Sequence, residues 1–120
     1  MLAPMIMKHY EHVPPSIYAG APEGIEMREM ITAQDGAPNF TLRVFDIHPG
    51  ASTPFHSHEW EHEVFILDGA GTVRTEGNEM SFEKGASVFL APHEKHCFVA
   101  DRGTPVRFIC VIPSSNRCRM

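Results

Sequence analysis

The chain has 120 residues, of which 42% are hydrophobic and 21% charged, a balance typical of one soluble globular domain. The net charge is −5 with the histidines neutral, which argues against nucleic acid and anionic membranes as partners because both attract basic surfaces. The three cysteines are odd in number and lack Cys-x-x-Cys spacing, so we expect no disulfide framework and a cytoplasmic protein.

Residues 1–23 predict an irregular arm, because they contain four prolines and a glycine and at most a short strand around residues 5–10. The first ten residues lack a basic stretch followed by a long apolar run, so we expect neither a signal peptide nor a membrane span there. An arm with so little core of its own could be buried by a partner subunit, which favours a homodimer. We expect its two histidines, His9 and His12, at the surface.

Beyond the arm, short β-prone segments alternate with turn signals such as Asp68-Gly69, and no segment has a convincing helical pattern. Strands are expected at residues 26–31, 40–47, 63–67, 71–76, 79–83, 87–90, 97–100 and 106–112. Many short strands with frequent turns predict an all-β sandwich or barrel. We therefore expect one β domain over residues 24–113, followed by a C-terminal tail at residues 114–120.

Alternation along two of these strands predicts which side chains face inward. In residues 40–47, Arg43 is expected to face water, which would turn Leu42 and Val44 toward the core. In residues 106–112, Arg107 is expected to face water. The same alternation then turns four side chains inward, those of Val106, Phe108, Cys110 and Ile112.

Four histidines predict a metal site. His56 and His58 lie two residues apart, so on one strand they point to the same face. His62 follows a bulky, charged insert that is expected to turn the chain into the next strand, where His62 can face the first pair. His96 follows the turn-forming residues 92–95. Neutral imidazole is the commonest protein ligand for transition metals, although any one of these histidines alone could be an ordinary half-buried residue.

The order of these residues resembles the cupins. The run from Gly50 through His56, His58 and His62 to Gly69 is similar to the first cupin motif, and residues 85–96 are similar to the second. Cupins usually carry a glutamate where this chain has His62, so the closer resemblance is to small, single-domain, conserved-barrel cupins with a four-histidine site. The resemblance implies a double-stranded β-helix, or jelly-roll, barrel, and an N-terminal segment that packs across a dimer.

The resemblance also implies one divalent transition metal per chain, held by His56, His58, His62 and His96. Manganese, iron or copper is favoured, with nickel and zinc as further options. Four neutral ligands leave the ion's charge uncompensated, which favours an anionic ligand in an open position. Phe108 and Cys110 are expected to line the pocket, although Cys110 could also be a plain buried apolar residue. Trp60 is expected either to close the rim or to pack outside the barrel.

Three functions remain open, each with a small-molecule ligand or substrate. The preferred one, which rests partly on the cupin resemblance, is a dioxygenase-type oxidoreductase that activates dioxygen or peroxide against a small, mostly apolar or unsaturated substrate. The second is a non-redox isomerase, lyase or decarboxylase that uses the ion as a Lewis acid, for which His93 or a rim glutamate would have to act as the base. The third is a non-catalytic ligand-binding cupin. Steady oxygen consumption would separate the first from the others.

Overall fold

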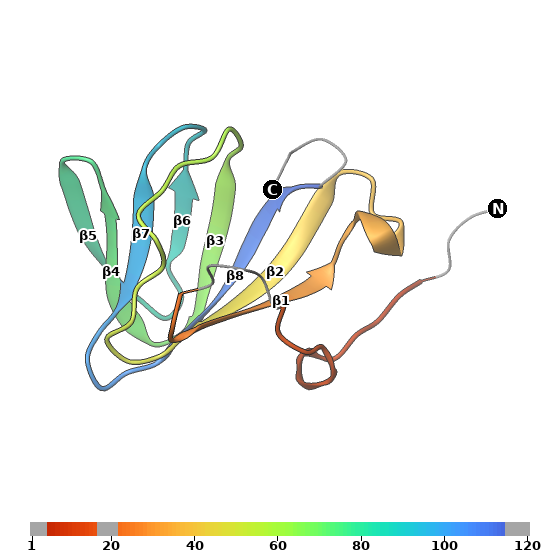
Figure 1. The fold of residues 1–120 in the computed structure, drawn as a ribbon, viewed down its shortest axis with the longest axis horizontal. Coiled ribbons are helices and arrows are strands. Elements are labelled where there is room, and N and C mark those ends of the chain that lie inside the picture. Colours follow the sequence, from red (N-terminus) through yellow and green to blue (C-terminus); the bar gives the residue numbers. More distant parts are fainter. Residues whose placement is uncertain (1–4, 17–21, 115–120) are drawn as a thin grey trace.

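Eight strands form two antiparallel sheets in the described part of the chain, residues 5–16 and 22–114 of a computed structural model (Figure 1). The larger sheet has the order β1-β2-β8-β3-β6 and the smaller one the order β5-β4-β7. The strands are β1 (Ile25–Ile31), β2 (Phe40–Ile47), β3 (His62–Asp68), β4 (Ala70–Thr75), β5 (Asn78–Glu83), β6 (Ser87–Leu90), β7 (His96–Ala100) and β8 (Val106–Pro113).

No α-helix occurs within the described residues, which contain only the 3-10 turns η1 (Tyr10–His12) and η2 (Ala33–Asp35). No helix there is long and apolar enough to cross a membrane. The prediction of an all-β fold is therefore confirmed. The predicted division into arm, barrel and tail stays a prediction, and residues 1–4, 17–21 and 115–120 of the arm and tail lie outside the described ranges.

The segment before β3 extends the smaller sheet. Isolated bridges pair Ser52 with Val99 and His56 with His96 along the free edge of β7. The amide of Thr53 donates to the carbonyl of Phe98 at 2.9 Å. This pairing brings the two histidine-bearing parts of the chain side by side, although they are forty residues apart.

The core lies between the sheets and follows strand alternation. Burial along β8 alternates at every residue, so the prediction that Val106, Phe108, Cys110 and Ile112 face inward is confirmed. Other core residues come from both sheets and include Ile47, Val64, Ile66, Val73, Phe82, Leu90, Phe98 and Ala100. Burial of apolar side chains on this scale is the main stabilising contribution in such a sandwich.

The prediction that Arg43 faces water is wrong. Its side chain is buried, and residue 43 lies on the inner face of β2 together with Phe45. Leu42 and Val44 consequently belong to the outer face, where Val44 is still buried. The prediction assumed that a charged side chain faces water. It failed because the inner face of β2 borders a cavity, in whose wall Arg43 lies, whereas the outer face is partly covered.

The arm covers part of that outer face. No strand forms at residues 5–10; instead η1 places Tyr10 against three side chains of the large sheet, and residues 10–16 lie beside β1 (Figure 1). The Tyr10 hydroxyl donates to Asp46, and the guanidinium groups of Arg28 and Arg107 lie 4.6 and 4.2 Å from the centroid of its ring. This cation–π contact ties the arm to β1, β2 and β8.

Candidate metal centre

Three histidines form a close cluster beside the free edge of β7 in the smaller sheet. His56 and His96 are bridged by backbone hydrogen bonds of 3.2 and 2.9 Å, which places their side chains next to each other. One ring nitrogen from each of His56, His58 and His96 lies within 4.8 Å of the other two. Three converging imidazoles are a set that can hold a transition metal ion.

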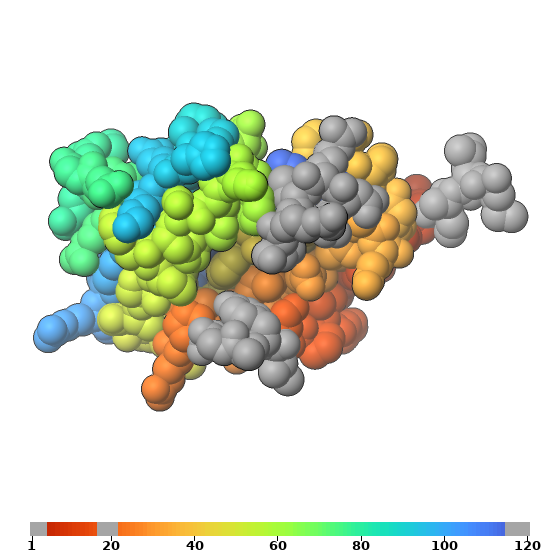
Figure 2. Space-filling model, turned by 45° about the horizontal axis from the view of Figure 1, so that its top comes forward, coloured from red at the N-terminus to blue at the C-terminus, as the bar shows by residue number. Residues whose placement is uncertain are grey.

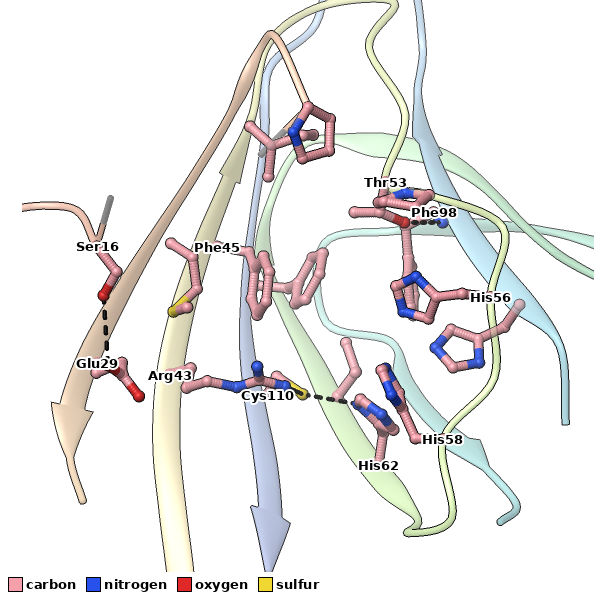
Figure 3. A pocket seen from close by; sticks show the side chains of 17 residues that line it. Ser16, Glu29, Arg43, Phe45, Thr53, His56, His58, His62, Phe98 and Cys110 are labelled. Carbon is pink, nitrogen blue, oxygen red and sulfur yellow. Dashed lines mark hydrogen bonds between the residues drawn. The ribbon is translucent and has the colours of Figure 1, made fainter. Parts of the chain in front are cut away.

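His62 lies beside this cluster without joining it. It begins β3, is buried, and its ring centroid is 4.9 Å from that of His58 and 5.0 Å from that of His96 (Figure 3). Its Nδ1 atom contacts the sulfur of Cys110 at 3.2 Å. Its Nε2 atom is buried and has no hydrogen-bond partner among the described residues. The structure thus brings three of the four predicted ligands together and leaves a nitrogen of the fourth unpartnered nearby.

The loop before β7 fixes the orientation of His96. Its Nδ1 atom lies 2.8 Å from the backbone carbonyl of Glu94, which can only accept, so Nδ1 carries the proton and Nε2 is free to bind a metal. The Glu94 side chain takes no part in this contact, because its carboxylate accepts from the amide of Ala91 at 3.1 Å. The exposed His93 has a positive φ of 68° and donates its backbone amide to the carbonyl of His58 at 2.6 Å.

Burial favours the neutral imidazole, the form that binds metals, in His56, His58 and His62. Burial lowers the pKa of His58 to about 4 and that of His62 to about 3, and it also lowers the pKa of His56. The neighbouring histidines and the guanidinium of Arg43 add smaller effects of the same sign, because positive charges repel one another. All three rings are therefore uncharged at neutral pH and ready to bind a cation.

Trp60 supports the cluster from outside the cavity. Its ring stacks on His58, with centroids 4.7 Å apart and planes 9° apart, and it packs against the core. It is not among the residues that line the cavity. The contact holds the imidazole of His58 in one orientation, as partners of ligand histidines commonly do.

A cavity of about 680 Å³ adjoins the histidines (Figure 3). Its walls are mostly apolar and include Phe108 and Cys110. Phe45 stacks on Phe108 at 5.0 Å, and Phe98 lies 4.8 Å from Phe108, so three aromatic rings form one continuous wall. Cys110 is buried, and this burial raises the pKa of its thiol. In volume and lining the cavity resembles sites that take a mid-sized organic molecule.

Two charged residues in the cavity wall were missed from the sequence, Glu29 and Arg43. They are register partners on β1 and β2, and register partners on neighbouring strands share a face. The strand pairing would have placed both on one face, but which face borders the cavity is not readable from either strand alone. In Figure 2 the orange residues of β1 and the yellow-green segment around residues 51–60 lie next to each other on one side of the molecule.

Comparison with known proteins supports the assignment of the fold. A curated relative, an oxalate-binding protein of Thermotoga maritima, is 27% identical over 114 residues, covering 90% of this chain and 93% of the relative. The solved polyketide cyclase RemF of Streptomyces resistomycificus is 34% identical with a TM-score of 0.82, covering 91% of this chain and 79% of the cyclase. An ectoine synthase from P. lautus is 25% identical with a TM-score of 0.75, covering 91% and 78%. The cupin domain family matches residues 43–112, more than half of the chain, and this protein therefore belongs to the cupin domain family.

Proposed function

We propose that this protein is a metal-dependent enzyme that acts on a mostly apolar organic substrate through a carbonyl or enol oxygen, in a cyclase- or lyase-type reaction without net oxidation. The observation that carries the proposal is the position of the histidine cluster, which opens onto a large aromatic cavity that also contains a carboxylate, Glu29. Such a cavity can hold a substrate with one oxygen at the metal and its carbon skeleton against the rings.

His56, His58 and His96 would hold the metal, with Nε2 of His62 as the fourth ligand. The residues fit an ion because burial keeps the imidazoles of His58 and His62 neutral at pH 7 and because the buried Nε2 of His62 lacks any other partner in the described chain. A bound divalent ion supplies Lewis-acid polarisation of a carbonyl or enol oxygen. The all-nitrogen donor set suits manganese, iron, copper, nickel or zinc.

The protein's own groups would bind the substrate and move a proton. Phe45, Phe98 and Phe108 would hold a flat apolar skeleton and exclude water from it. Glu29 would accept a proton from the carbon next to the polarised carbonyl, the role of a general base. That carbon would then attack a second carbonyl of the same substrate, and the hydroxyl so formed would leave as water with the proton that Glu29 returns. The Ser16 hydroxyl lies 3.4 Å from the Oε1 atom of Glu29 and would help to position the carboxylate. Glu29 would thus take the role for which the sequence offered His93 or a rim glutamate.

The similar solved proteins include enzymes, and the polyketide cyclase supports ring-forming chemistry here. The dioxygenase predicted from the sequence is the second candidate. It is favoured by the neutral all-nitrogen donor set, which leaves the full charge of an ion available to an anionic ligand. A non-catalytic role is the third candidate, in line with the similarity to the oxalate-binding protein of Thermotoga maritima.

One assay separates the three candidates. Protein purified without chelator would be analysed for metal, reconstituted with each of the five ions, and incubated with aromatic β-keto compounds under air and under argon. The proposal predicts a product that has lost water, formed equally without oxygen, and strongly reduced turnover in Glu29→Gln. Oxygen consumption with an oxygenated product would establish the dioxygenase. Binding without any turnover would establish the ligand-binding role.

The predicted homodimer remains part of this proposal. In the arm, Met5 and Met7 are apolar and almost fully exposed, at 91% and 89%, and a partner subunit could cover them. Sedimentation velocity on the full chain and on a chain that begins at residue 8 tests the idea. A dimer that dissociates on truncation is the expected result, and a monomer in both samples would contradict it.

A further inference from the structure

Arg43 places a positive charge in the cavity wall. Its side chain is only 8% exposed, and its guanidinium points across β8 toward Cys110 and His62 (Figure 3). Nη2 donates to the sulfur of Cys110 at 3.4 Å, and Cζ lies 5.0 Å from the centroid of the Phe45 ring. A thiol is a weak acceptor and an aromatic face a weak partner for a buried cation, so these contacts position the group without neutralising it.

No acidic side chain compensates this charge. None of the ion pairs within residues 5–16 and 22–114 includes Arg43, and the remaining residues of the chain include neither Asp nor Glu. The Nε atom of Arg43 is buried and has no hydrogen-bond partner among the described residues. Glu29 is its register partner, yet the two side chains do not approach within ion-pair distance.

The arginines on the outer face of the same sheet, unlike Arg43, have an acidic partner. Arg28 and Arg107, on the outer face, both pair with Asp46, at 3.3 and 2.7 Å. Burying a charge without a partner is costly, and an apolar residue of similar volume is often as stable or more stable at such a position. A buried arginine that points into a cavity and has an unsatisfied donor is therefore a candidate anion-binding group.

We infer that Arg43 binds an anionic oxygen group of the substrate, either a carboxylate or an ionised enol or phenol. The substrate would then be an aromatic or polyunsaturated anion, with its flat skeleton on the rings of Phe45 and Phe108 and its charged oxygen on the guanidinium. The planar fork of arginine matches such groups with two parallel donors. This inference rests on the proposed function, because it names the substrate class of that same cavity.

The test uses two probes of one shape, 2-naphthoate and 2-naphthamide, which differ in charge. Their dissociation constants would be measured by calorimetry and by the fluorescence of Trp60, the single tryptophan, in chelator-treated and in metal-loaded protein. The variants are Arg43→Met, Arg43→Lys and a control, Arg74→Met, which removes a charge from an exposed position on β4 paired with Glu79 at 3.7 Å. Thermal unfolding of each variant accompanies the titrations.

In metal-free wild-type protein, naphthoate should bind about tenfold or more tightly than naphthamide, as expected for hydrogen bonds to a charged group. This ratio should fall to near one in Arg43→Met, fall partly in Arg43→Lys, and stay unchanged in Arg74→Met. Arg43→Met should unfold at the same temperature as the wild type or at a higher one.

An equal ratio in wild type and Arg43→Met would overturn the inference, as would failure of both probes to bind. Strong destabilisation of Arg43→Met together with a normal Arg43→Lys would show a structural role instead. The metal-free measurement does not depend on the ion, so a protein that takes up no metal would refute the proposed function while the charge ratio still reported on Arg43.

Discussion

The Nδ1 atom of His62 and the sulfur of Cys110 lie 3.2 Å apart, on β3 and β8. The same sulfur accepts from Arg43 at 3.4 Å, so one thiol links a buried imidazole to a buried guanidinium. Because the contact engages Nδ1, the nitrogen of His62 left for a metal is Nε2. The contact therefore bears directly on whether the centre uses three histidines or four.

Metal affinity should reveal the role of His62. His96→Ala removes a member of the close cluster and should abolish stoichiometric binding, whereas His62→Ala should weaken binding at least about tenfold if Nε2 is a ligand. Competition titration with a chromogenic chelator measures both, with circular dichroism to establish that each variant is folded. His12→Ala is the matched control because His12 is exposed in the arm. Unchanged affinity in His62→Ala would establish a three-histidine centre.

Acid should destabilise the metal-free protein. In the folded state burial holds the pKa of His58 at about 4 and that of His62 at about 3, whereas both should be near 6.5 when unfolded. The unfolded chain therefore binds more protons than the folded chain below about pH 6.5, so stability falls as the pH drops from about 7 to about 3, and these two groups have no effect above that window.

Urea unfolding across that pH range measures the effect, and His62→Asn provides the comparison. Removal of the buried imidazole should make the loss of stability with falling pH shallower than in the wild type. A wild-type protein that becomes more stable on acidification over this range would contradict the assigned direction of the pKa shifts.

Removal of the Tyr10 hydroxyl should loosen the arm. The hydroxyl donates to Asp46 and accepts from Arg107 at 2.7 Å and from Arg28 at 3.2 Å. We expect Tyr10→Phe to lower the free energy of unfolding by about 1 kcal/mol, because the site is partly exposed, and Tyr10→Ala to cost about 2 kcal/mol because the cation–π contacts are also lost. Urea denaturation is the measurement. Glu11→Ala changes an adjacent exposed position and should leave the stability unchanged. Equal stability of all three variants would show that the Tyr10 contacts do not hold the arm to the sheet.

Gly69 and Gly77 provide a test of turn geometry. Both have positive φ, at 90° and 79°, but a Cβ atom at Gly69 would lie 2.1 Å from the carbonyl oxygen of Pro105, whereas nothing lies within 4 Å at Gly77. Gly77→Ala should cost about 1 kcal/mol for the backbone conformation alone, and Gly69→Ala should cost at least about 3 kcal/mol because the backbone must also move. Thermal unfolding compares the two, and similar losses would contradict the close approach.

Strand positions were predictable where apolar residues alternate with a clear break. Residues 40–47 coincide with β2, and β8 extends only one residue beyond the predicted 106–112. The inward faces were predictable for β8, where the only charged side chain, Arg107, is on the outside. They were not predictable for β2, where Arg43 and Asp46 lie on opposite faces and Tyr10 of a distant arm covers the charge of Asp46.

The histidine site was predictable in composition but not in detail. The spacing of His56 and His58 and their closeness to His96 follow from the pairing of two segments. The separation of His62 from that group depends on the path of residues 59–61, and the stacking of Trp60 on His58 depends on side-chain packing. Neither the insert nor the packing has a periodic sequence signal.

The cavity has two walls of different origin. The histidines and the aromatic wall lie within residues 43–112, the part that matches the cupin family. The second wall comes from residues that precede this range in the sequence, namely Ser16, Pro22, Ile25, Met27 and Glu29. Substitutions in the second wall would reshape the cavity without touching any of the four histidines. Relatives that share the histidine-bearing wall can therefore differ in the ligands they accept, and exchange of residues 16–29 between two cupins is a direct route to altered selectivity.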